Sequence, residues 1–224
     1  MAPAEESILS RRFTRGIALC LSVLAICGGV PQRARAAVVS AAELLDSRQE
    51  YSADFSLRTS AQGGFRGRVI HAQGRERREF AAMGGPQVLL LRRDLDEAVM
   101  MWPERHFYLS TSFSQASSLI GGFESVMLDR RKEGAETVDG EACTRYAVTG
   151  SSMQGGSFRG KMWFTGDGIL MKAMGTVQFQ GKETSLETSL SHLQRTKADP
   201  SVFVRPSDYK GMPLDLSSFG LGGK

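Results

Sequence analysis

The sequence has few cysteines, which excludes a fold held together by disulfides. It contains three cysteines in 224 residues. Cys20 and Cys27 fall in an N-terminal apolar segment, so only Cys143 remains for the folded part of the chain. No intramolecular disulfide can form from one cysteine, and we interpret Cys143 as a small buried residue of a strand. The roughly 188 residues after position 36 are enough to bury one core without such bonds.

Recognisable catalytic and metal-binding motifs are also absent from the sequence. The three histidines, His71, His106 and His192, have no partner at metal-ligand spacing, and there is no H-E-x-x-H, C-x-x-C or G-x-S-x-G. We interpret the acidic cluster Asp94–Glu97 as a solvated turn. We therefore predict no metal, no cofactor and no catalytic residue. A hydrolase stays open only if Ser, His and an acidic residue converge from separate parts of the chain.

Basic residues are concentrated at the N-terminus, which argues against a nucleic-acid partner. The formal net charge is +4, but five arginines and two glutamates lie within residues 1–36. The remainder holds 23 basic and 22 acidic residues, a net charge of +1. Proteins that bind nucleic acid need a concentrated basic face. We interpret the densest remaining patch, Arg75–Arg78, as a solvated strand edge, since charged edges resist unwanted pairing.

The first 36 residues have the pattern of a secretory signal peptide. Met1–Gly16 carries three arginines, Ile17–Val30 is almost wholly apolar, and Ala34–Ala36 supplies a small-x-small site. An apolar run of this length is short for a bilayer, which takes roughly 20 residues. We predict cleavage after Ala36 and a periplasmic protein. An uncleaved N-terminal anchor is the alternative.

Two variants of this signal differ in their support. Phe13 directly follows Arg11-Arg12, so the choice between the general secretory and the twin-arginine route stays open. Cys27 stands where a lipoprotein signal would be cleaved. Ile26 is bulky where such a site needs a small residue, so we do not expect lipid anchoring at Cys27.

Hydrophobic periodicity predicts two helices in a chain that is otherwise made of strands. Ser40 and Glu43 form a capping box for a helix over Ala41–Gln49. A second helix is predicted over Ser114–Leu128, interrupted by Gly121-Gly122, which either weaken the helix or let it pack closely. The predicted strands are Tyr51–Thr59, Phe65–Ala72, Arg75–Ala81, Gln87–Arg92, Ala98–Trp102, Phe107–Leu109, Ala135–Val138, Ala142–Thr149, Gly160–Phe164, Ile169–Met174, Gly175–Gln180 and Leu186–Gln194.

Two segments illustrate the strand pattern. Tyr51–Thr59 alternates, with Tyr51, Ala53, Phe55 and Leu57 expected on one face. Leu91–Ser110 is predicted to hold two apolar strands about a corner at Pro103, and no catalytic motif lies in it or near it. Helix, strands, helix and strands in this order predict an α+β fold with an antiparallel sheet and helices on one side. We assign residues 37–212 to one domain and 213–224 to a flexible tail.

Nine methionines remain after Met1, and most fall in predicted strands. Methionine is flexible and polarisable, so it suits surfaces that adapt to varied apolar ligands. It also fills ordinary cores. The composition leaves both interpretations open.

Four sequence elements in a fixed order carry a family resemblance. They are Leu91–Asp94 leading to Met101–Pro103 and Tyr108; Glu136–Gly140 with Cys143–Tyr146; Met162–Phe164 followed by Gly168–Lys172; and Asp199–Phe203 with Pro206–Lys210. Together they resemble the periplasmic outer-membrane lipoprotein carrier (LolA/LolB-like) superfamily, and more closely its uncharacterised exported members. The match spans about Ser40–Lys210.

The resemblance implies a curved antiparallel sheet, an open half-barrel, whose concave face is covered by helices that close an apolar cavity. It implies a non-catalytic protein that binds lipid or lipoprotein acyl chains, as a periplasmic carrier or chaperone. We expect a monomer with transient membrane contact and an envelope protein as a further partner. The alternative is an extracytoplasmic sensor or partner-binding module on the same fold. The candidate cavity residues are Met100, Trp102, Leu119, Phe123, Met162, Phe164 and Met171, and on the Leu91–Ser110 segment we expect the Ala98-Met100-Trp102 face to point inward.

Overall fold

The computed structural model describes residues 37–60, 63–82, 85–119, 125–153 and 155–213. All of them belong to one compact unit, Ala36–Lys224, and the other unit, Met1–Arg35, lies outside the described residues. The predicted signal peptide and tail boundaries therefore stay predictions. No helix among the described residues is long and apolar enough to cross a membrane.

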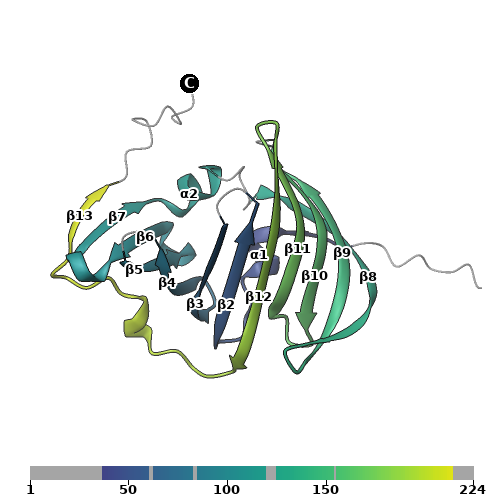
Figure 1. Cartoon of the computed structure of the whole chain (residues 1–224), viewed down its shortest axis with the longest axis horizontal. Coiled ribbons are helices and arrows are strands. Elements are labelled where there is room, and N and C mark those ends of the chain that lie inside the picture. Colours follow the sequence, from purple (N-terminus) through teal and green to yellow (C-terminus); the bar gives the residue numbers. More distant parts are fainter. Residues whose placement is uncertain (1–36, 61–62, 83–84, 120–124, 154, 214–224) are drawn as a thin grey trace, which may run out of the picture. The chain divides into compact units, whose positions relative to one another are not determined.

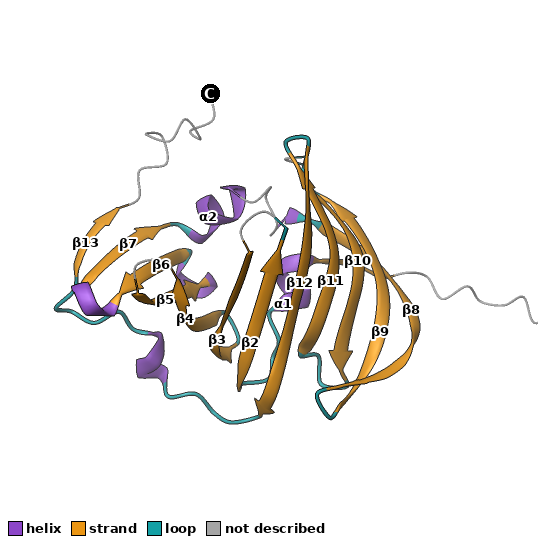
Figure 2. Cartoon of the chain, viewed as in Figure 1, coloured by secondary structure: helices purple, strands orange, loops and turns teal. Residues whose placement is uncertain are grey.

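Strands make up most of the described chain (Figure 2). The strands are β1 Ala37–Ser40, β2 Tyr51–Thr59, β3 Gly63–Ala72, β4 Arg75–Ala82, β5 Gly85–Arg92, β6 Glu97–Trp102, β7 Phe107–Thr111, β8 Met127–Val138, β9 Glu141–Ser151, β10 Ser157–Thr165, β11 Leu170–Phe179, β12 Lys182–Gln194 and β13 Lys210–Pro213. The α-helices are α1 Ala41–Leu45 and α2 Phe113–Leu119, and the 3₁₀ turns are η1 Arg93–Leu95, η2 Pro103–Arg105 and η4 Pro200–Phe203.

The strands form one open sheet in the order β1-β8-β9-β10-β11-β12-β2-β3-β4-β5-β6-β7-β13 (Figure 1). All neighbours are antiparallel except β13, which runs parallel to β7. The predicted large antiparallel sheet is thus confirmed. The described helices have only five and seven residues, so the expected cover of helices over the concave face is not confirmed. Figure 1 shows α1 within the curve that β8 to β12 describe.

Strand β2 and the β6–β7 hairpin match the sequence pattern closely. Tyr51, Ala53 and Phe55 are buried on one face of β2, and Leu57 packs against the same cluster. Strands β6 and β7 pair antiparallel on either side of η2, which begins at Pro103. The sequence therefore predicted these elements and the face that Tyr51, Ala53, Phe55 and Leu57 share.

Helix α1 begins as predicted and ends earlier. The hydroxyl of Ser40 accepts a hydrogen bond from the Glu43 N–H at 3.1 Å. The helix stops at Leu45, four residues before the predicted end at Gln49. Asp46 terminates it, and both of its carboxylate oxygens accept from the Gly74 N–H, at 2.9 and 3.1 Å. A tertiary contact to the β3–β4 turn thus competes with further helix.

The predicted second helix over Ser114–Leu128 is wrong in its C-terminal part. Helix α2 ends at Leu119, residues 120–124 lie outside the description, and β8 begins at Met127. Val126 and Leu128 are buried whereas Met127 is 49% exposed. That alternation is typical of a strand. The helix was predicted because the apolar residues of this segment are spaced three and four apart, as on one face of a helix.

Strand β11 is continuous where the sequence predicted two strands. Gly175, taken as a break, lies inside β11 and pairs with Gly160 of β10. A β-carbon on either glycine would collide with the backbone of the other strand. Glycines at such a position allow close strand approach, so this pair marks close contact of β10 with β11 rather than the end of a strand.

The two shortest strands, β1 and β13, were not predicted. Four residues are too few for a periodic signal, and β13 is stabilised by pairing with β7 far away in sequence. The Pro206–Tyr209 segment before it lies next to η2. The Tyr209 ring lies 5.2 Å from that of His106, and Tyr209 packs against the cluster Val88, Leu90, Val99 and Met101.

Candidate functional site: an apolar cavity with one charged wall

A cavity of about 880 Å³ lies among strands β2–β6, strands β10–β12 and the two α-helices. Packed interiors contain few voids larger than a water molecule, so this space is not a packing defect. Its volume lies in the range of small-molecule sites, about 300–1,000 Å³. Leu45 at the end of α1, and Phe113 and Ala116 of α2, contribute to the lining.

One side of the cavity, here called the apolar wall, consists of side chains from β10, β11 and β12. Its members are Phe158, Met162, Leu170, Met171, Ala173, Leu186 and Leu190. Lys172, Thr188 and Ser189 are the polar exceptions on these strands. Lys172 Nζ lies 5.2 Å from the ring centroid of Trp163, and this cation–π contact stabilises the charge of the ammonium group.

A second side, the charged wall, is formed by Tyr51 of β2, Glu76 and Arg78 of β4, and Arg93 of η1. Arg78 Nε donates to Glu76 Oε1 at 2.7 Å, and the guanidinium lies 5.0 Å from the Phe55 ring centroid. Arg93 Nη1 donates to Asp46 Oδ1 at 3.4 Å. Two arginines and one buried carboxylate thus border this side of a mainly apolar space.

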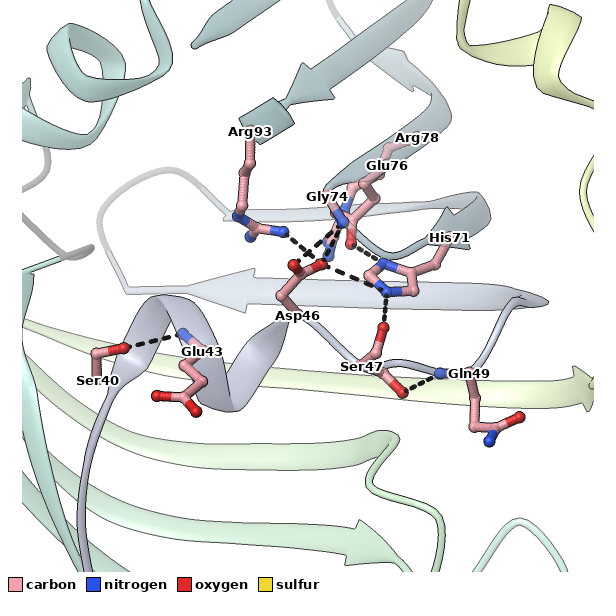
Figure 3. A network of polar contacts seen from close by, with 10 residues as sticks. All are labelled: Ser40, Glu43, Asp46, Ser47, Gln49, His71, Gly74, Glu76, Arg78 and Arg93. Atoms are coloured by element: carbon pink, nitrogen blue, oxygen red, sulfur yellow. Dashed lines mark hydrogen bonds and ion pairs between the residues drawn. The ribbon is translucent and has the colours of Figure 1, made fainter. Parts of the chain in front are cut away.

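A buried histidine lies behind the charged wall and ties it together (Figure 3). His71 is fully buried, and its Nε2 lies 2.9 Å from the carbonyl oxygen of Ser47 and 3.7 Å from Asp46 Oδ1. Its Nδ1 lies 3.4 Å from Glu76 Oε2, and its ring stacks on Tyr51 at 4.9 Å. The network joins the end of α1 to strands β2, β3 and β4.

Burial and charge act in opposite directions on the two acids of this wall. Burial disfavours ionised Glu76, but the Arg78 charge and the His71 hydrogen bond outweigh it, so the pKa of Glu76 lies far below its ordinary value. Burial, and then the Glu76 charge, raise the pKa of Tyr51 well above its ordinary value. At neutral pH the wall therefore presents an ionised carboxylate and a neutral phenol.

The structure brings together three of the seven predicted cavity residues. Met100, Met162 and Met171 line the cavity. Trp102 is not among the lining residues, and its ring packs against Phe107 at 5.7 Å. Phe164 is buried in the cluster that contains Val126 and contacts the Tyr146 ring. The side chain of Leu119 and all of Phe123 lie outside the described residues.

Strand β6 separates the cavity from a packed cluster. Ala98 and Met100 line the cavity, whereas Val99 and Met101 are buried on the opposite face with Val88 and Leu90. The Ala98-Met100 part of the expected inward face thus lies at the cavity. Trp102, at the end of the strand, does not.

The interpretation of Arg75–Arg78 as a solvated strand edge is wrong. Strand β4 pairs with β3 on one side and with β5 on the other, so it is an interior strand. Glu76 and Arg78 point inward and partner each other, while Arg77 donates to Glu79 and to the Val202 carbonyl. The sequence did contain a signal of this arrangement. Glu76 and Arg78 have opposite charges, and they share one face of the strand with the apolar Phe80.

The histidines form no hydrolytic arrangement in the described part of the chain. His106 Nδ1 contacts Asp208 at 2.8 Å, and His192 Nδ1 contacts Asp54 at 2.8 Å. Neither they nor His71 hydrogen-bonds a serine hydroxyl there. No group of three His, Cys, Asp or Glu among the described residues could hold a metal ion. Cys143, the one thiol among the described residues, is buried in β9, and this burial raises its pKa.

Comparisons with known proteins give similarity of fold and no match of sequence. Neither protein-family models nor curated proteins match the sequence. An uncharacterised conserved protein from Thermus thermophilus aligns with a TM-score of 0.50 and 11% identity, over 77% of this chain and 96% of that chain. A LolA superfamily protein from Nitrosomonas europaea aligns with a TM-score of 0.39 and 11% identity, over 74% and 98%.

The Pseudomonas aeruginosa MucA/MucB complex provides a third similar structure. It aligns with a TM-score of 0.43 and 12% identity, over 76% of this chain and 62% of that chain. At such identities these likenesses concern the fold alone. LolA superfamily and lipoprotein-sorting domain proteins are thus among the solved structures that align with this chain.

Proposed function

We propose that this chain is an exported, non-catalytic protein that binds the acyl chains of a lipid or lipoprotein in its cavity. The observation that carries the proposal is the cavity of about 880 Å³, whose apolar wall is built from Phe, Leu, Met and Ala side chains. Transfer of each methylene from water to such a lining contributes about 0.8 kcal/mol. A long chain therefore gains affinity without any specific polar contact.

The character of the lining residues supports a ligand that varies in shape. Met100, Met162 and Met171 border the cavity from three different strands. Methionine has three rotatable bonds and adapts to irregular surfaces. Three of the nine methionines after Met1 thus line the cavity, which favours their interpretation as an adaptable lining.

The proposed setting is the periplasm, where a carrier or chaperone would shield acyl chains from water. The N-terminal pattern of residues 1–36 supports export. The near-neutral charge of the remainder suits a ligand held by apolar contact.

Protein-partner binding by an extracytoplasmic sensor is the second candidate. The observation in its favour is that the outer edges of β1 and β13 have no strand partner among the described residues. Such an edge can accept an added strand from another protein.

Native mass spectrometry of the protein purified without detergent tests the proposal. We expect a population heavier than the bare chain by the mass of one or more amphiphiles, which organic solvent extracts. A chain that stays bare across several gentle preparations, and takes up no added fatty alcohol, would contradict acyl-chain binding. That result would favour the partner-binding alternative.

A further inference from the structure

Arg78 presents unused hydrogen-bond donors to the cavity. Its Nε is engaged by Glu76, and one face of its guanidinium covers Phe55. No hydrogen-bond partner for its Nη1 or Nη2 is found among the described residues. The side chain remains 29% exposed, and because it lines the cavity this exposure is toward the cavity. A guanidinium carries five donors in a rigid fork, and here only one is used.

Arg93, in the 3₁₀ turn η1, also has unused hydrogen-bond donors. Its Nη1 contacts Asp46 at the long distance of 3.4 Å, and its guanidinium lies 5.0 Å from the Phe113 ring centroid of α2. Its Nε is buried and has no hydrogen-bond partner in the part of the chain that the structure describes. Buried polar groups are nearly always paired in folded proteins, so this donor set is incomplete.

The neighbouring carboxylates already have partners. Glu76 uses one oxygen for Arg78 and the other for His71. Asp46 accepts from the Gly74 N–H and is not a lining residue. Tyr51, whose raised pKa keeps the phenol protonated, adds an O–H to the lining. Arg78 Nη1 and Nη2 are therefore unused donors at the cavity, whereas both oxygens of Glu76 already have partners.

We propose that Arg78 and Arg93 bind the anionic head group of the acyl ligand, a carboxylate or a phosphate. This rests on the proposed function and names its ligand class as an anionic amphiphile. The planar guanidinium fork matches both oxyanions, and charge-assisted hydrogen bonds are about twice as strong as neutral ones. The head group then lies at the charged wall, and the chain extends along Phe158, Met162 and Met171.

The test compares three amphiphiles with the same chain: dodecanoate, dodecyl phosphate and dodecanol. Each competes with a neutral fluorescent apolar dye for the purified full chain. We expect at least one anion to bind about tenfold more tightly than dodecanol. This ratio corresponds to a difference in binding free energy of about 1.4 kcal/mol. Preference for dodecanoate identifies a carboxylate site and preference for dodecyl phosphate a phosphate site; either result supports the proposal.

Two variants replace the guanidinium donors with neutral side chains. Arg93→Gln removes the second guanidinium, and the double variant Glu76→Gln with Arg78→Gln replaces both members of the buried pair. Each should reduce the anion preference, the ratio of anion affinity to dodecanol affinity, several-fold. Arg77→Gln is the matched control, because Arg77 is adjacent on β4 and does not line the cavity.

Equal affinity of the wild type for dodecanol and both anions would overturn the head-group site while leaving acyl-chain binding intact. Full preference retained in both Arg93→Gln and the double variant would overturn it as well. If none of the three amphiphiles binds, the proposed function itself fails. The two levels of the proposal are thereby separated.

Discussion

The two walls of the cavity are built by opposite means. The apolar wall, on β10–β12, gains its stability from side chains removed from water. The charged wall, on β2, β4 and η1, buries Glu76 and His71 and must offset their desolvation by close pairing. Replacing a buried ion pair by apolar residues is often neutral or stabilising. The contrast between the two walls is therefore the basis for the proposal that the charged wall binds a ligand.

The largest expected effect is the loss of one member of the charged wall. Glu76→Ala leaves Arg78 and His71 without their carboxylate and should lower the free energy of unfolding by about 3–5 kcal/mol. Urea denaturation measures it. The control is Glu187→Ala, whose ion pair with Arg58 is well exposed. Equal losses in the two variants would show that the charged wall is no more tightly coupled than the surface.

A truncation in the apolar wall should come next. Met171 is fully buried, so Met171→Ala should cost about 2–5 kcal/mol from lost burial and an enlarged cavity. Thermal unfolding followed by circular dichroism is the measurement. Met153→Ala, at a residue 98% exposed, should stay within about 0.5 kcal/mol of the wild type. A loss at Met171 as small as that at Met153 would argue against a structured wall.

Acid should weaken the charged wall in particular. The folded pKa of Glu76 lies below its ordinary value of 4.5, so the unfolded chain binds the proton more readily. Its contribution is fully present above that ordinary value. It is lost as the pH falls below it toward the folded pKa, by up to about 1.4 kcal/mol per pH unit.

Stability curves from urea denaturation at successive pH values below about 5 can isolate this group. Several other carboxylates have lowered pKa values, so the informative quantity is the difference between the wild type and Glu76→Gln. The variant should lose less stability on acidification. Parallel curves would show that Glu76 has the same pKa in both states.

Enlarging a lining side chain should shorten the acyl chain that fits. Met100→Trp narrows the cavity from β6, and each displaced methylene should weaken binding by about 0.8 kcal/mol, about fourfold. Fatty alcohols of increasing length, competing with the dye, give the dependence. Val99→Ala, on the opposite face of β6, should lower stability and leave these affinities unchanged. Similar effects of the two variants on binding would place the ligand elsewhere.

The smallest effect on stability is expected at Arg195, an exposed arginine whose ion pairs are as short as the buried pair of Glu76 and Arg78. Arg195 donates to Glu141 at 2.8 and 2.9 Å and to Asp167 at 2.6 Å. These bonds join the end of β12 to the β8–β9 and β10–β11 turns. Its side chain is 38% exposed. Arg195→Gln should cost less than about 1 kcal/mol, and less again at high salt. A loss comparable to that of Glu76→Ala would contradict the role given to burial.

The sequence predicts the elements whose signals are local and misses those that depend on distant partners. The alternation of Tyr51–Thr59 and the proline corner at Pro103 give β2, β6 and β7 directly. The strand start at Met127 is decided by pairing of β8 with β9 and β1, which no local spacing reveals. A short apolar run fits both the helix period and the strand period, and pairing with distant strands determines which of the two forms.

The candidate site divides in the same way. Its methionines were recognisable by composition, because an adaptable apolar surface uses that residue type. Arg78 was not, since its charge predicts exposure until β4 is known to be an interior strand. Arg93 joins the site only because η1 brings it beside Asp46 at the end of α1. Such convergence from separate elements is a property of the fold.

A crystal structure with a fatty acid brominated at its terminal carbon tests the two-wall account most directly. We predict the anomalous bromine peak against Met162 and Met171, with the carboxylate within hydrogen-bond distance of Arg78 or Arg93. A bromine peak outside the cavity, or a carboxylate placed at the apolar wall, would contradict the account.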